Sequence, residues 1–301
     1  MGTTATFVAE ATDRPAALKQ LERMVRVVES TEAELSTWHD SSVLSRLNQH
    51  PVNTWLSIPD TVCTVMQEVA TWHRTTDGAF DPAIGSLVDA WDIRGNGRVP
   101  VGNALATAVD RSGFQHVSID EDQCAAMRNA DVTLDAGGFG KGAALARVER
   151  AEQAHSGAWL IDFGGQVAVS GLGSDGPWPV AIAHPLLRET AVVELLLAEG
   201  SVATSGGSER DLVVDPETTV GHIVDPRTGQ AISRSSSVTV WHEDPLAADA
   251  LSTALYVMGT RLGVEWAEDR GIAAYFVTTD ESTGDLGYFA TPQFEMRFLR
   301  P

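Results

Sequence analysis

Apolar residues recur with helical spacing in the first part of the chain. The opening segment MGTTATFVAE predicts a strand, and Asp13 and Pro15 after it are typical of a helix N-cap and first turn. The apolar positions that follow have the spacing of one helix face: Leu18, Leu21, Val25 and Val28. A second helix is predicted over residues 59–75, and the Gly/Asp/Pro-rich stretch TTDGAFDPAIGSLVDAW after it predicts a loop.

The middle and the end of the chain show other patterns. Residues 131–155 predict a strand (VTLDA), a glycine loop (GGFGKG) and a helix. Short strand-like segments separated by turns extend from Trp159 to Val240, and an apolar helix is then predicted between Asp244 and Gly259. Because helices and strands do not alternate as regular βαβ units, we expect an α+β fold with two lobes and mixed or antiparallel sheets.

The charge balance narrows the classes of partner. The chain has 301 residues, of which 43% are hydrophobic, enough for a sizeable core. Its 21 basic and 41 acidic residues give a formal net charge of -20, which disfavours nucleic acid and anionic membrane surfaces as partners. The sequence contains no apolar run of about 18 residues, so no membrane span is predicted. The abrupt start at Met1 leaves open whether a leader segment was removed.

Two cysteines, Cys63 and Cys124, are too few for a disulfide-dense scaffold or a cysteine-based zinc site. Cys63 lies in the apolar stretch TVCTVMQEVATW, which favours a small buried hydrophobe over a reactive thiol. The cysteine count leaves the cellular compartment open.

The stretch ADALSTAL combines a carboxylate with hydroxyl groups in apolar surroundings. Asp249 and Thr253 are one helical turn apart, so their oxygens project from one face of the predicted helix. A buried carboxylate is costly unless its charge is compensated, and Mg²⁺ is a cation that takes carboxylate, hydroxyl and phosphate oxygens. The alternative is that Asp249 only complements the dipole of its own helix.

The segment LDAGGFGKG contains glycines that let backbone approach a ligand. Gly138, Gly140 and Ala143 fit the dinucleotide fingerprint G-x-G-x-x-A, although no repeating βαβ unit surrounds them. The Walker A pattern fails because Asp135 stands at its first glycine. Lys141 is interpreted either as a partner for phosphate or as a solvated lysine after a glycine turn.

Three other residues have both a functional and a plain interpretation. His222, in GHIVDPRTG, can accept a proton near neutral pH or bond to nearby backbone. Trp38, in STWHDSS, can stack on a flat ring or serve as a core aromatic, and Asp81, in DGAFDP, can be only a turn residue. No Ser-His-Asp order, HExxH motif or cysteine set supports a hydrolase or a zinc enzyme.

Taken in order, these segments resemble the FAD:protein FMN transferase family, also called ApbE and formerly labelled a thiamine-biosynthesis lipoprotein family. The resemblance runs nearly from end to end of the chain. The motifs that carry it are MGT, STWHDSSVLSRLN, TDGAFDPAIGSLVDAW, LDAGGFGKG, WLIDFGGQVAVSG, SVATSGG, HIVDPRTG and ADALSTAL. It implies a single ApbE-like domain over residues 1–301, with a flavin cleft between the two lobes.

The resemblance also implies roles for particular residues. His222 matches the proton acceptor of the family, and Lys141 is implied to act on the phosphoryl oxygens. The implied metal ligands are the backbone carbonyl of Gly138 and the side chains of Asp249, Ser252 and Thr253. The residues implied around FAD are Met1, Trp38, Ala79, Phe80, Asp81, Asp135, Lys141 and Ile223.

Three positions depart from the family pattern. Ser252 stands where some members have a further carboxylate, which implies a weaker metal site or one with more water. Gly138 replaces a small residue such as Ala, and a ligand that is a backbone carbonyl should tolerate this change. Trp38 stands where other members have Tyr, so stacking on a flat ring should persist.

The implied reaction moves the FMN half of FAD to a Thr or Ser hydroxyl of an acceptor flavoprotein and releases AMP, with Mg²⁺ or another divalent cation required. The implied acceptor is a subunit, commonly of a membrane redox complex, with a short Asp/Ser/Thr/Gly-rich motif. The expected location is the periplasm or the outer face of the cytoplasmic membrane. The alternatives are a metal-dependent FAD pyrophosphatase, an FAD-binding protein without turnover and, from the G-x-G-x-x-A match alone, a nicotinamide oxidoreductase.

Overall fold

The computed structural model describes residues 3–155, 157–207, 211–215, 218–280 and 282–299. The chain divides into two compact units. Unit 1 comprises Met1–Glu32, Gly140–Gly206 and Ser235–Pro301, and unit 2 comprises Ala33–Phe139 and Gly207–Arg234. The chain therefore leaves unit 1 twice and returns to it twice. That the two units fold as one domain over residues 1–301 stays a prediction.

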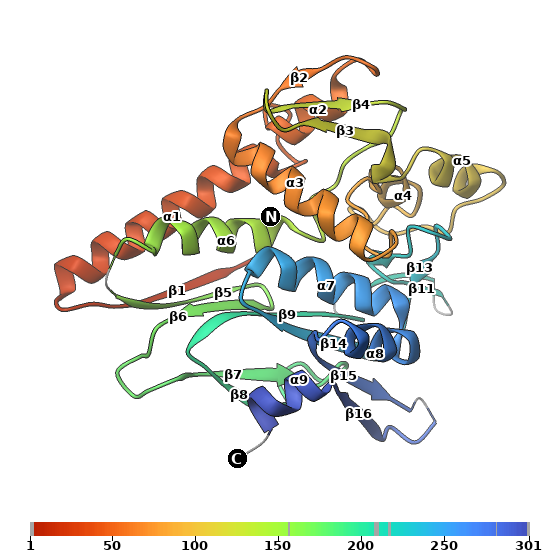
Figure 1. The fold of residues 1–301 in the computed structure, drawn as a ribbon. Coiled ribbons are helices and arrows are strands. Elements are labelled where there is room, and N and C mark those ends of the chain that lie inside the picture. The colour runs from red at the N-terminus through yellow and green to blue at the C-terminus, as the bar shows by residue number, and fades with distance from the viewer. Residues whose placement is uncertain (1–2, 156, 208–210, 216–217, 281, 300–301) are drawn as a thin grey trace. The chain divides into compact units, whose positions relative to one another are not determined.

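Unit 1 is built around an antiparallel sheet. Among the described residues this sheet has seven strands, and every neighbouring pair is antiparallel (Figure 1). In order across the sheet the strands are β1 (Ala5–Glu10), β5 (Ala158–Phe163), β6 (Gln166–Ser170), β9 (Glu199–Gly206), β14 (Ser236–His242), β15 (Ala273–Thr279) and β16 (Leu286–Ala290). The observed sheet confirms the predicted α+β class, the opening strand and the strand-like segments between Trp159 and Val240.

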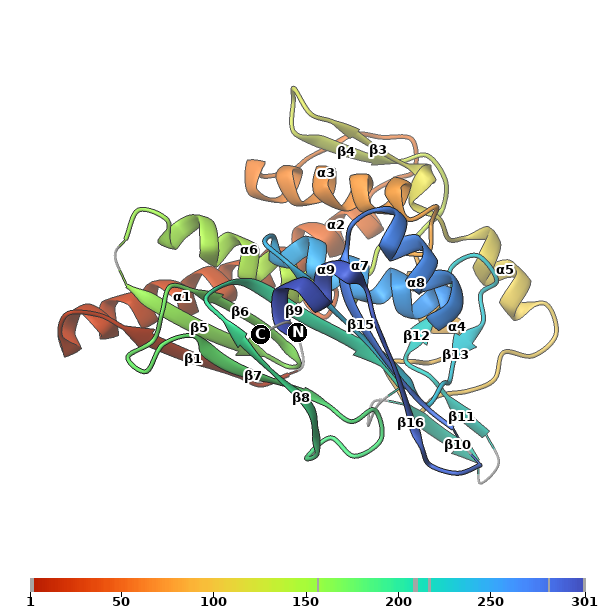
Figure 2. The same ribbon diagram turned by 60° about the horizontal axis from the view of Figure 1, so that its bottom comes forward.

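Helices α1 (Arg14–Leu35) and α6 (Gly140–Glu152) cover one face of this sheet (Figure 2). Asp13 Oδ1 accepts a hydrogen bond from Ala16 N at 2.8 Å, so the predicted N-cap is confirmed. Met24 of α1 and Val148 of α6 pack in one buried cluster with Ile161 of β5. Because side chains alternate across a strand, neighbouring residues of β5 serve the opposite face of the sheet.

Helix α7 (Pro245–Met258) packs against β9, β14 and α6, and α8 (Thr260–Asp269) follows it. The Asp244 side chain accepts a hydrogen bond from Leu246 N at 2.9 Å, and Gly259 ends the helix with a φ of 77°. The predicted start and end are both confirmed. Nearly every side chain of α7 is buried, as its apolar sequence requires.

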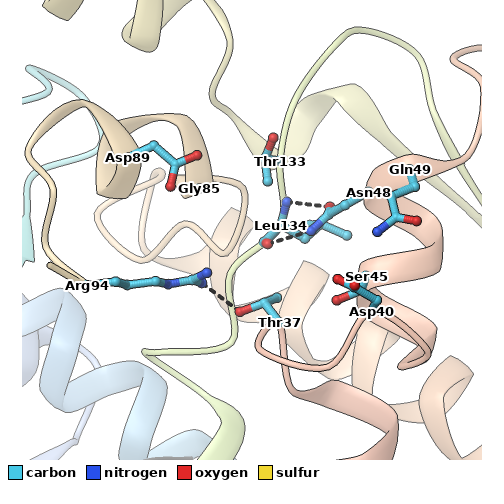
Figure 3. Close-up of a pocket in the computed structure, with 10 residues that line it drawn as sticks. All are labelled: Thr37, Asp40, Ser45, Asn48, Gln49, Gly85, Asp89, Arg94, Thr133 and Leu134. Atoms are coloured by element: carbon cyan, nitrogen blue, oxygen red, sulfur yellow. Dashed lines mark hydrogen bonds between the residues drawn. The ribbon is translucent and has the colours of Figure 1, made fainter.

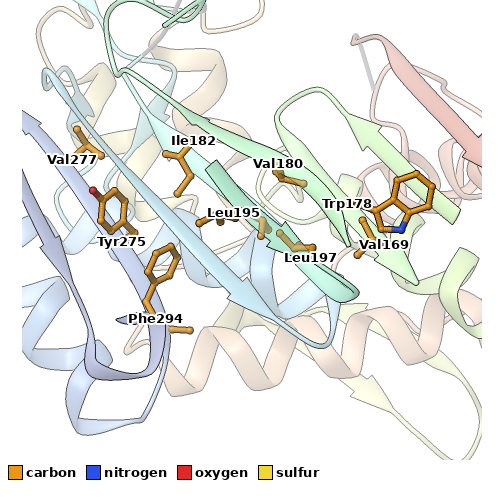
Figure 4. Close-up of a cluster of buried hydrophobic side chains, with 11 residues drawn as sticks. Val169, Trp178, Val180, Ile182, Leu195, Leu197, Tyr275, Val277 and Phe294 are labelled. Carbon is orange, nitrogen blue, oxygen red and sulfur yellow. The ribbon is translucent and has the colours of Figure 1, made fainter. Parts of the chain in front are cut away.

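A second apolar layer lies on the other face of the sheet. The hairpin of β7 (Trp178–Ala183) and β8 (Ala191–Leu197) contributes Ile182, Leu195 and Leu197 to it (Figure 4). The short helix α9 (Pro292–Phe294) contributes Phe294, whose ring stacks on that of Tyr275 with 5.1 Å between centroids. Full burial of a phenylalanine contributes about 1.5–3 kcal/mol.

Unit 2 is made of short helices, small sheets and long connections. Its helices are α2 (Val43–Gln49), α3 (Asp60–Thr75), α4 (Gly85–Ala90), α5 (Ala104–Asp110) and the 3-10 turn η1 (Phe114–His116). Its strands are β2 (Leu56–Ser57), β3 (Val117–Asp120), β4 (Ala125–Arg128), β10 (Leu212–Asp215), β11 (Thr218–Val220), β12 (Ile223–Val224) and β13 (Ala231–Ile232). The predicted helix over residues 59–75 is confirmed as α3.

Two predicted elements are wrong: the stretch GSLVDA in the predicted loop forms the helix α4 (Gly85–Ala90), and the segment VTLDA forms no strand. A side chain takes the place of a neighbouring strand, because the Asn48 amide accepts from Leu134 N at 2.8 Å and donates to Leu134 O at 2.9 Å. Thr133 O accepts from Gly85 N at 2.8 Å. These backbone groups are thus satisfied by isolated partners, whereas a β-ladder needs a second strand. No helix in the described part of the chain is long and apolar enough to cross a membrane.

Candidate active site

A close approach of two helices in unit 1 forms the first group of candidate residues. At Gly142, in the first turn of α6, a Cβ atom would lie 2.6 Å from Pro245 O and 2.8 Å from Asp249 Cβ. Glycine is therefore needed for α6 to lie so close to α7. The approach lets Gly142 N donate a hydrogen bond to Asp249 Oδ2 at 2.9 Å.

Asp249 is a buried carboxylate with two compensating partners. It is only 4% exposed, and Lys141 Nζ lies 3.3 Å from its Oδ1. Its negative charge thus faces the N-terminal turn of α6, where a helix dipole favours an anion. The alternative that Asp249 serves the dipole of its own helix is wrong, because no acidic residue lies in the first turn of α7.

Hydroxyl groups gather around the same turn of α7. The hydroxyls of Ser252 and Thr253 donate to Asp249 O at 3.0 and 3.1 Å. Ser205, near the end of β9, lies with its Oγ 2.9 Å from Ser252 Oγ and 3.5 Å from Thr253 Oγ1. Sequence reasoning missed Ser205, although the SVATSGG motif places a hydroxyl directly before the glycines that end a predicted strand.

This group fits a hard cation by the chemistry of its donors. Asp249, Ser205, Ser252 and Thr253 offer only carboxylate and hydroxyl oxygens, the ligands that Mg²⁺ prefers. Among the residues that the structure describes, no group of three or more His, Cys, Asp or Glu side chains is arranged to hold a metal. Gly138, the other implied ligand, belongs to unit 2 and is half-buried in the turn before α6.

In unit 2, Arg94 brings together two residues that the sequence singled out. Its guanidinium carbon lies 5.2 Å from the ring centroid of Trp38, and its Nη2 forms a short ion pair with Asp135 Oδ2. Arg94 also donates to Thr37 Oγ1 at 2.6 Å. The Trp38 side chain is 64% exposed, so it is no core aromatic, and its indole is accessible to a flat ring. Arg94 itself was not predicted as a site residue.

A cavity of about 150 Å³ lies beside this group in unit 2 (Figure 3). Its lining is mostly polar and includes Thr37, Asp40, Asp89, Arg94 and Thr133. Figure 3 shows Arg94 reaching the cavity from the segment after α4, with Thr37 bonded to it. Arg94 and Thr37 thus belong both to this cavity and to the group around Trp38.

The loop of Ala79, Phe80 and Asp81 is buried and rigidly bonded. The carboxylate of Asp81 accepts hydrogen bonds from Ala83 N at 2.7 Å and from Phe114 N at 3.1 Å. Burial raises the pKa of Asp81, and the neighbouring His73 and these backbone donors oppose the rise. Since the side chains of this loop are buried, contact with a ligand would come from its backbone.

His222 has an acidic partner that the sequence did not reveal. Its Nδ1 lies 2.8 Å from Asp211 Oδ1, and its backbone N donates to the same oxygen at 3.1 Å. Because a carboxylate only accepts, Nδ1 is the donor in this hydrogen bond, and in the neutral ring the lone pair then lies on Nε2. This is the arrangement of a histidine oriented to accept a proton.

Ile223 and Asp225 follow His222 closely in the sequence. Ile223 begins β12 and is half-buried, paired with Ile232 of β13. Asp225, the next carboxylate along the chain, accepts from Arg227 Nε at 2.9 Å and Nη2 at 3.0 Å, so its oxygens are already engaged. Met1 lies outside the described residues.

Comparison with known proteins points to one family. A sequence profile of the ApbE family matches residues 1–276. The chain is 31% identical to the FAD:protein FMN transferase of Klebsiella pneumoniae over 260 residues, which are 82% of this chain and 73% of that protein. It is 29% identical to the protein of the same name from Vibrio cholerae, covering 85% of this chain and 78% of that one. The crystal structure of the Pseudomonas stutzeri flavinyl transferase ApbE, apo form, superposes with a TM-score of 0.87 and 29% identity, covering 100% of this chain and 95% of that chain.

Proposed function

Because the chain belongs to the ApbE family, we propose that it is an FAD:protein FMN transferase. It moves the FMN half of FAD onto a Thr or Ser hydroxyl of an acceptor flavoprotein and releases AMP. The observation that carries this proposal is the buried Asp249, held against the N-terminal turn of α6 beside Lys141 and a group of hydroxyls. The reaction needs such a combination of a cation-binding carboxylate and a phosphate-binding lysine.

The residues of unit 1 serve the pyrophosphate of FAD. Asp249, Ser252 and Thr253 would hold Mg²⁺ or another divalent cation. The carbonyl of Gly138, in unit 2, is a further ligand that the resemblance implies. When bound, the cation supplies positive charge that stabilises the phosphoryl oxygens as the bond to AMP breaks. Lys141 contributes a second positive charge, which the chain needs locally because its formal net charge is -20.

His222 serves as the general base. Asp211 fixes its tautomer and orientation, so that Nε2 can take the proton of the attacking Thr or Ser hydroxyl. In the resulting imidazolium both ring nitrogens carry protons, and the Asp211 carboxylate stabilises the charge. Asp225 is the weaker candidate for this role because Arg227 already occupies its oxygens.

The exposed indole of Trp38 supplies a stacking surface for the flavin. Asp135, held by Arg94, and the backbone of Ala79, Phe80 and Asp81 supply polar contacts to FAD. Ile223 and Met1 complete the proposed contacts to FAD. The acceptor is a flavoprotein subunit with an Asp/Ser/Thr/Gly-rich motif, in a membrane redox complex, and the reaction takes place in the periplasm or at the outer face of the cytoplasmic membrane.

The second candidate is an FAD pyrophosphatase, favoured by the same oxygen ligands. In that reaction water replaces the acceptor hydroxyl, and free FMN and AMP are released. The two reactions use the same assigned residues. They differ in the attacking group, which is a protein hydroxyl or water, and therefore in their products.

The test is incubation with FAD, Mg²⁺ and a peptide that carries an Asp/Ser/Thr/Gly-rich motif, followed by mass spectrometry. A peptide heavier by one FMN group, formed with an equal amount of AMP, supports the transferase. Free FMN and AMP without a modified peptide support the pyrophosphatase, and unchanged FAD with full occupancy supports a carrier. Full transfer after exhaustive chelation would contradict the proposed role of the cation.

A further inference from the structure

A buried amide of unit 1 lies at the first turn of the helix that carries Asp249. Gln166, the first residue of β6, is 1% exposed, and its Nε2 donates to Pro245 O at 2.7 Å. The same nitrogen donates to Ser201 Oγ at 3.2 Å, on the neighbouring strand β9. The first contact joins the sheet of unit 1 to the start of α7, and the second holds the amide against the sheet.

The partners of this amide fix its orientation. A backbone carbonyl only accepts, so the NH₂ group of Gln166 is the group that faces Pro245 O. The hydroxyl of Ser201 donates to Val167 O at 2.9 Å and accepts from Gln166 with a lone pair. Both hydrogens of Nε2 are thus used, whereas Oε1 is buried and accepts no hydrogen bond from the described part of the chain. The role of this glutamine therefore rests on its two donors.

Pro245 O is the point at which three elements of unit 1 meet. It is the carbonyl to which the backbone N of Asp249, four residues on in α7, donates in a regular helix. From α6, Gly142 comes so close that a Cβ atom there would lie 2.6 Å from the same oxygen. From β6, the oxygen receives Nε2 of Gln166. One carbonyl thus relates the peptide of Asp249 to the sheet and to α6.

The place of this carbonyl bears on the carboxylate of Asp249. Asp249 Oδ2 accepts from Gly142 N at 2.9 Å, and Asp249 Oδ1 lies 3.3 Å from Lys141 Nζ, so both oxygens are set against α6. Mg²⁺ demands near-ideal octahedral geometry, with ligands at about 2.0–2.1 Å. A shift of the first turn of α7 by a fraction of an ångström would therefore weaken a cation site there.

We propose that Gln166 is a positioning residue for Asp249. By holding Pro245 O, it sets the distance of the first turn of α7 from α6 and from the sheet, and so the place of the Asp249 carboxylate. This role rests on the proposed function, which assigns Asp249 to a divalent cation. Gln166 acts through the backbone of the helix and not as a ligand.

Gln20, in α1 of the same unit, offers a matched control. It is 3% exposed, and its Oε1, like that of Gln166, accepts no hydrogen bond from the described part of the chain. Its Nε2 donates to Gly157 O at 3.4 Å, so this bond holds the segment before β5 and not α7. The two glutamines are alike in size and burial and differ in what their amides hold.

The test replaces each glutamine with methionine, which has a similar length and no donor. In Gln166→Met, the affinity of the folded, FAD-free chain for Mn²⁺ should fall by about tenfold to hundredfold, the range for residues that orient metal ligands. Hydrogen exchange of the backbone amides at the start of α7 should become about tenfold faster, because the turn loses its bond to the sheet. Gln20→Met should leave both at their wild-type values. Calorimetry and peptide mass spectrometry measure them.

Thermal unfolding separates positioning from a general loss of stability. The midpoint for Gln166→Met should stay within about 5 °C of wild type, as expected for the net loss of one hydrogen bond. Ser201→Ala removes only the second partner of the amide, so it should show the same changes in Mn²⁺ affinity and exchange at smaller size. This variant decides the matter if Gln166→Met does not fold.

Wild-type Mn²⁺ affinity in Gln166→Met would overturn the proposed role of Gln166, as would equal changes in Gln20→Met. If Mn²⁺ binds to neither wild type nor variant, the proposed cation site has failed. Hydrogen exchange then still tests the hold on α7: faster exchange in Gln166→Met alone supports it, and unchanged exchange overturns it.

Discussion

The candidate residues of unit 1 and unit 2 differ in how they are held. Asp249 is 4% exposed and lies between regular elements, the helices α6 and α7, whereas Trp38 is 64% exposed and lies in a connection before α2. The first group has its charges and hydroxyls satisfied by one another, and the second presents an open aromatic face. A buried, preorganised set of oxygens suits a small ion, while an open ring suits a large planar group that must enter and leave.

We expect the largest effect at Asp249, whose substitution tests whether the buried group in unit 1 is a cation site. Asp249→Asn keeps an oxygen to accept from Gly142 N but removes the negative charge that a cation requires. Turnover of FAD should fall by at least about 10⁴-fold, to the background of the assay. Metal binding to the FAD-free chain, measured by calorimetry with Mn²⁺, should be lost as well.

The matched control is Asp162→Asn, an exposed carboxylate on β5 of the same unit. It removes the same charge without touching α6 or α7, so turnover should stay near that of wild type. If Asp249→Asn binds Mn²⁺ as tightly as this control does, the buried group in unit 1 is not the cation site.

The second effect concerns His222, the proposed proton acceptor in unit 2. His222→Ala should lose roughly 10²–10⁴-fold in the rate of FMN transfer while FAD affinity changes little. Asp211→Asn, which keeps the shape but no longer fixes the tautomer, should lose roughly 10–10³-fold. Transfer rates and FAD titrations on the same preparations measure both. Wild-type transfer by His222→Ala would make the histidine a turn residue.

A third, smaller effect is expected at Ser205, which touches the ligands that the resemblance implies. Ser205→Ala removes the hydroxyl that bonds to Ser252 and Thr253, so Mn²⁺ affinity should fall by roughly tenfold. Thr204→Ala, one residue earlier and on the other face of β9, is the control. Equal affinities in the two variants would show that Ser205 has no part in cation binding.

Substitutions of Trp38 and Arg94 in unit 2 should have still smaller effects. Trp38→Ala should lower FAD affinity by about threefold to tenfold and reduce the quenching of flavin fluorescence. Arg94→Lys should have a smaller effect of the same sign, because it keeps a charge near Asp135 but loses the planar group beside the indole. Fluorescence titration checks both, and an unchanged affinity for Trp38→Ala would place the flavin elsewhere.

The smallest effect is a pH dependence of stability at Asp81. Since burial raises its pKa above the ordinary value of 3.8, its contribution to stability is fully present below that pH. The contribution is lost as the pH rises through the raised pKa, when the buried group becomes charged. Asp81→Asn stays neutral and keeps an oxygen for Ala83 N and Phe114 N. Urea unfolding should therefore show the variant gaining stability relative to wild type as the pH rises from about 4 towards neutrality.

The sequence predicted the regular elements well because their signals are local. Asp13 and Asp244 cap their helices as their positions indicated, and Gly259 ends α7. VTLDA was mistaken for a strand because a β-branched, apolar segment has the composition of one. Its partner, the amide of Asn48, lies far away in the sequence and leaves no periodic signal.

Arg94 and Ser205 were missed for the same reason. Arg94 and Asp135 are brought together by tertiary structure, as are Ser205 and Ser252, and no spacing in the sequence relates either pair. The acidic partner of His222 is separated from it by a hairpin, so the periodicity of neither strand reports the contact. Motif resemblance singled out the residues that are proposed to carry chemistry, whereas the contacts that orient them became visible only in the fold.

Unit 1 is formed from segments that lie far apart in the sequence, and this has a consequence while the chain is synthesised. Strand β1 is made well before its sheet partner β5, which begins only at Ala158. At about 5–20 residues per second, roughly 7–30 seconds pass between the two. During that interval the edge of β1 and the apolar side of α1 have no native neighbour from the sheet. A ribosome that stalls before Ala158 would hold a fragment with both surfaces open to other chains, and slow codons in that stretch should favour aggregation over folding.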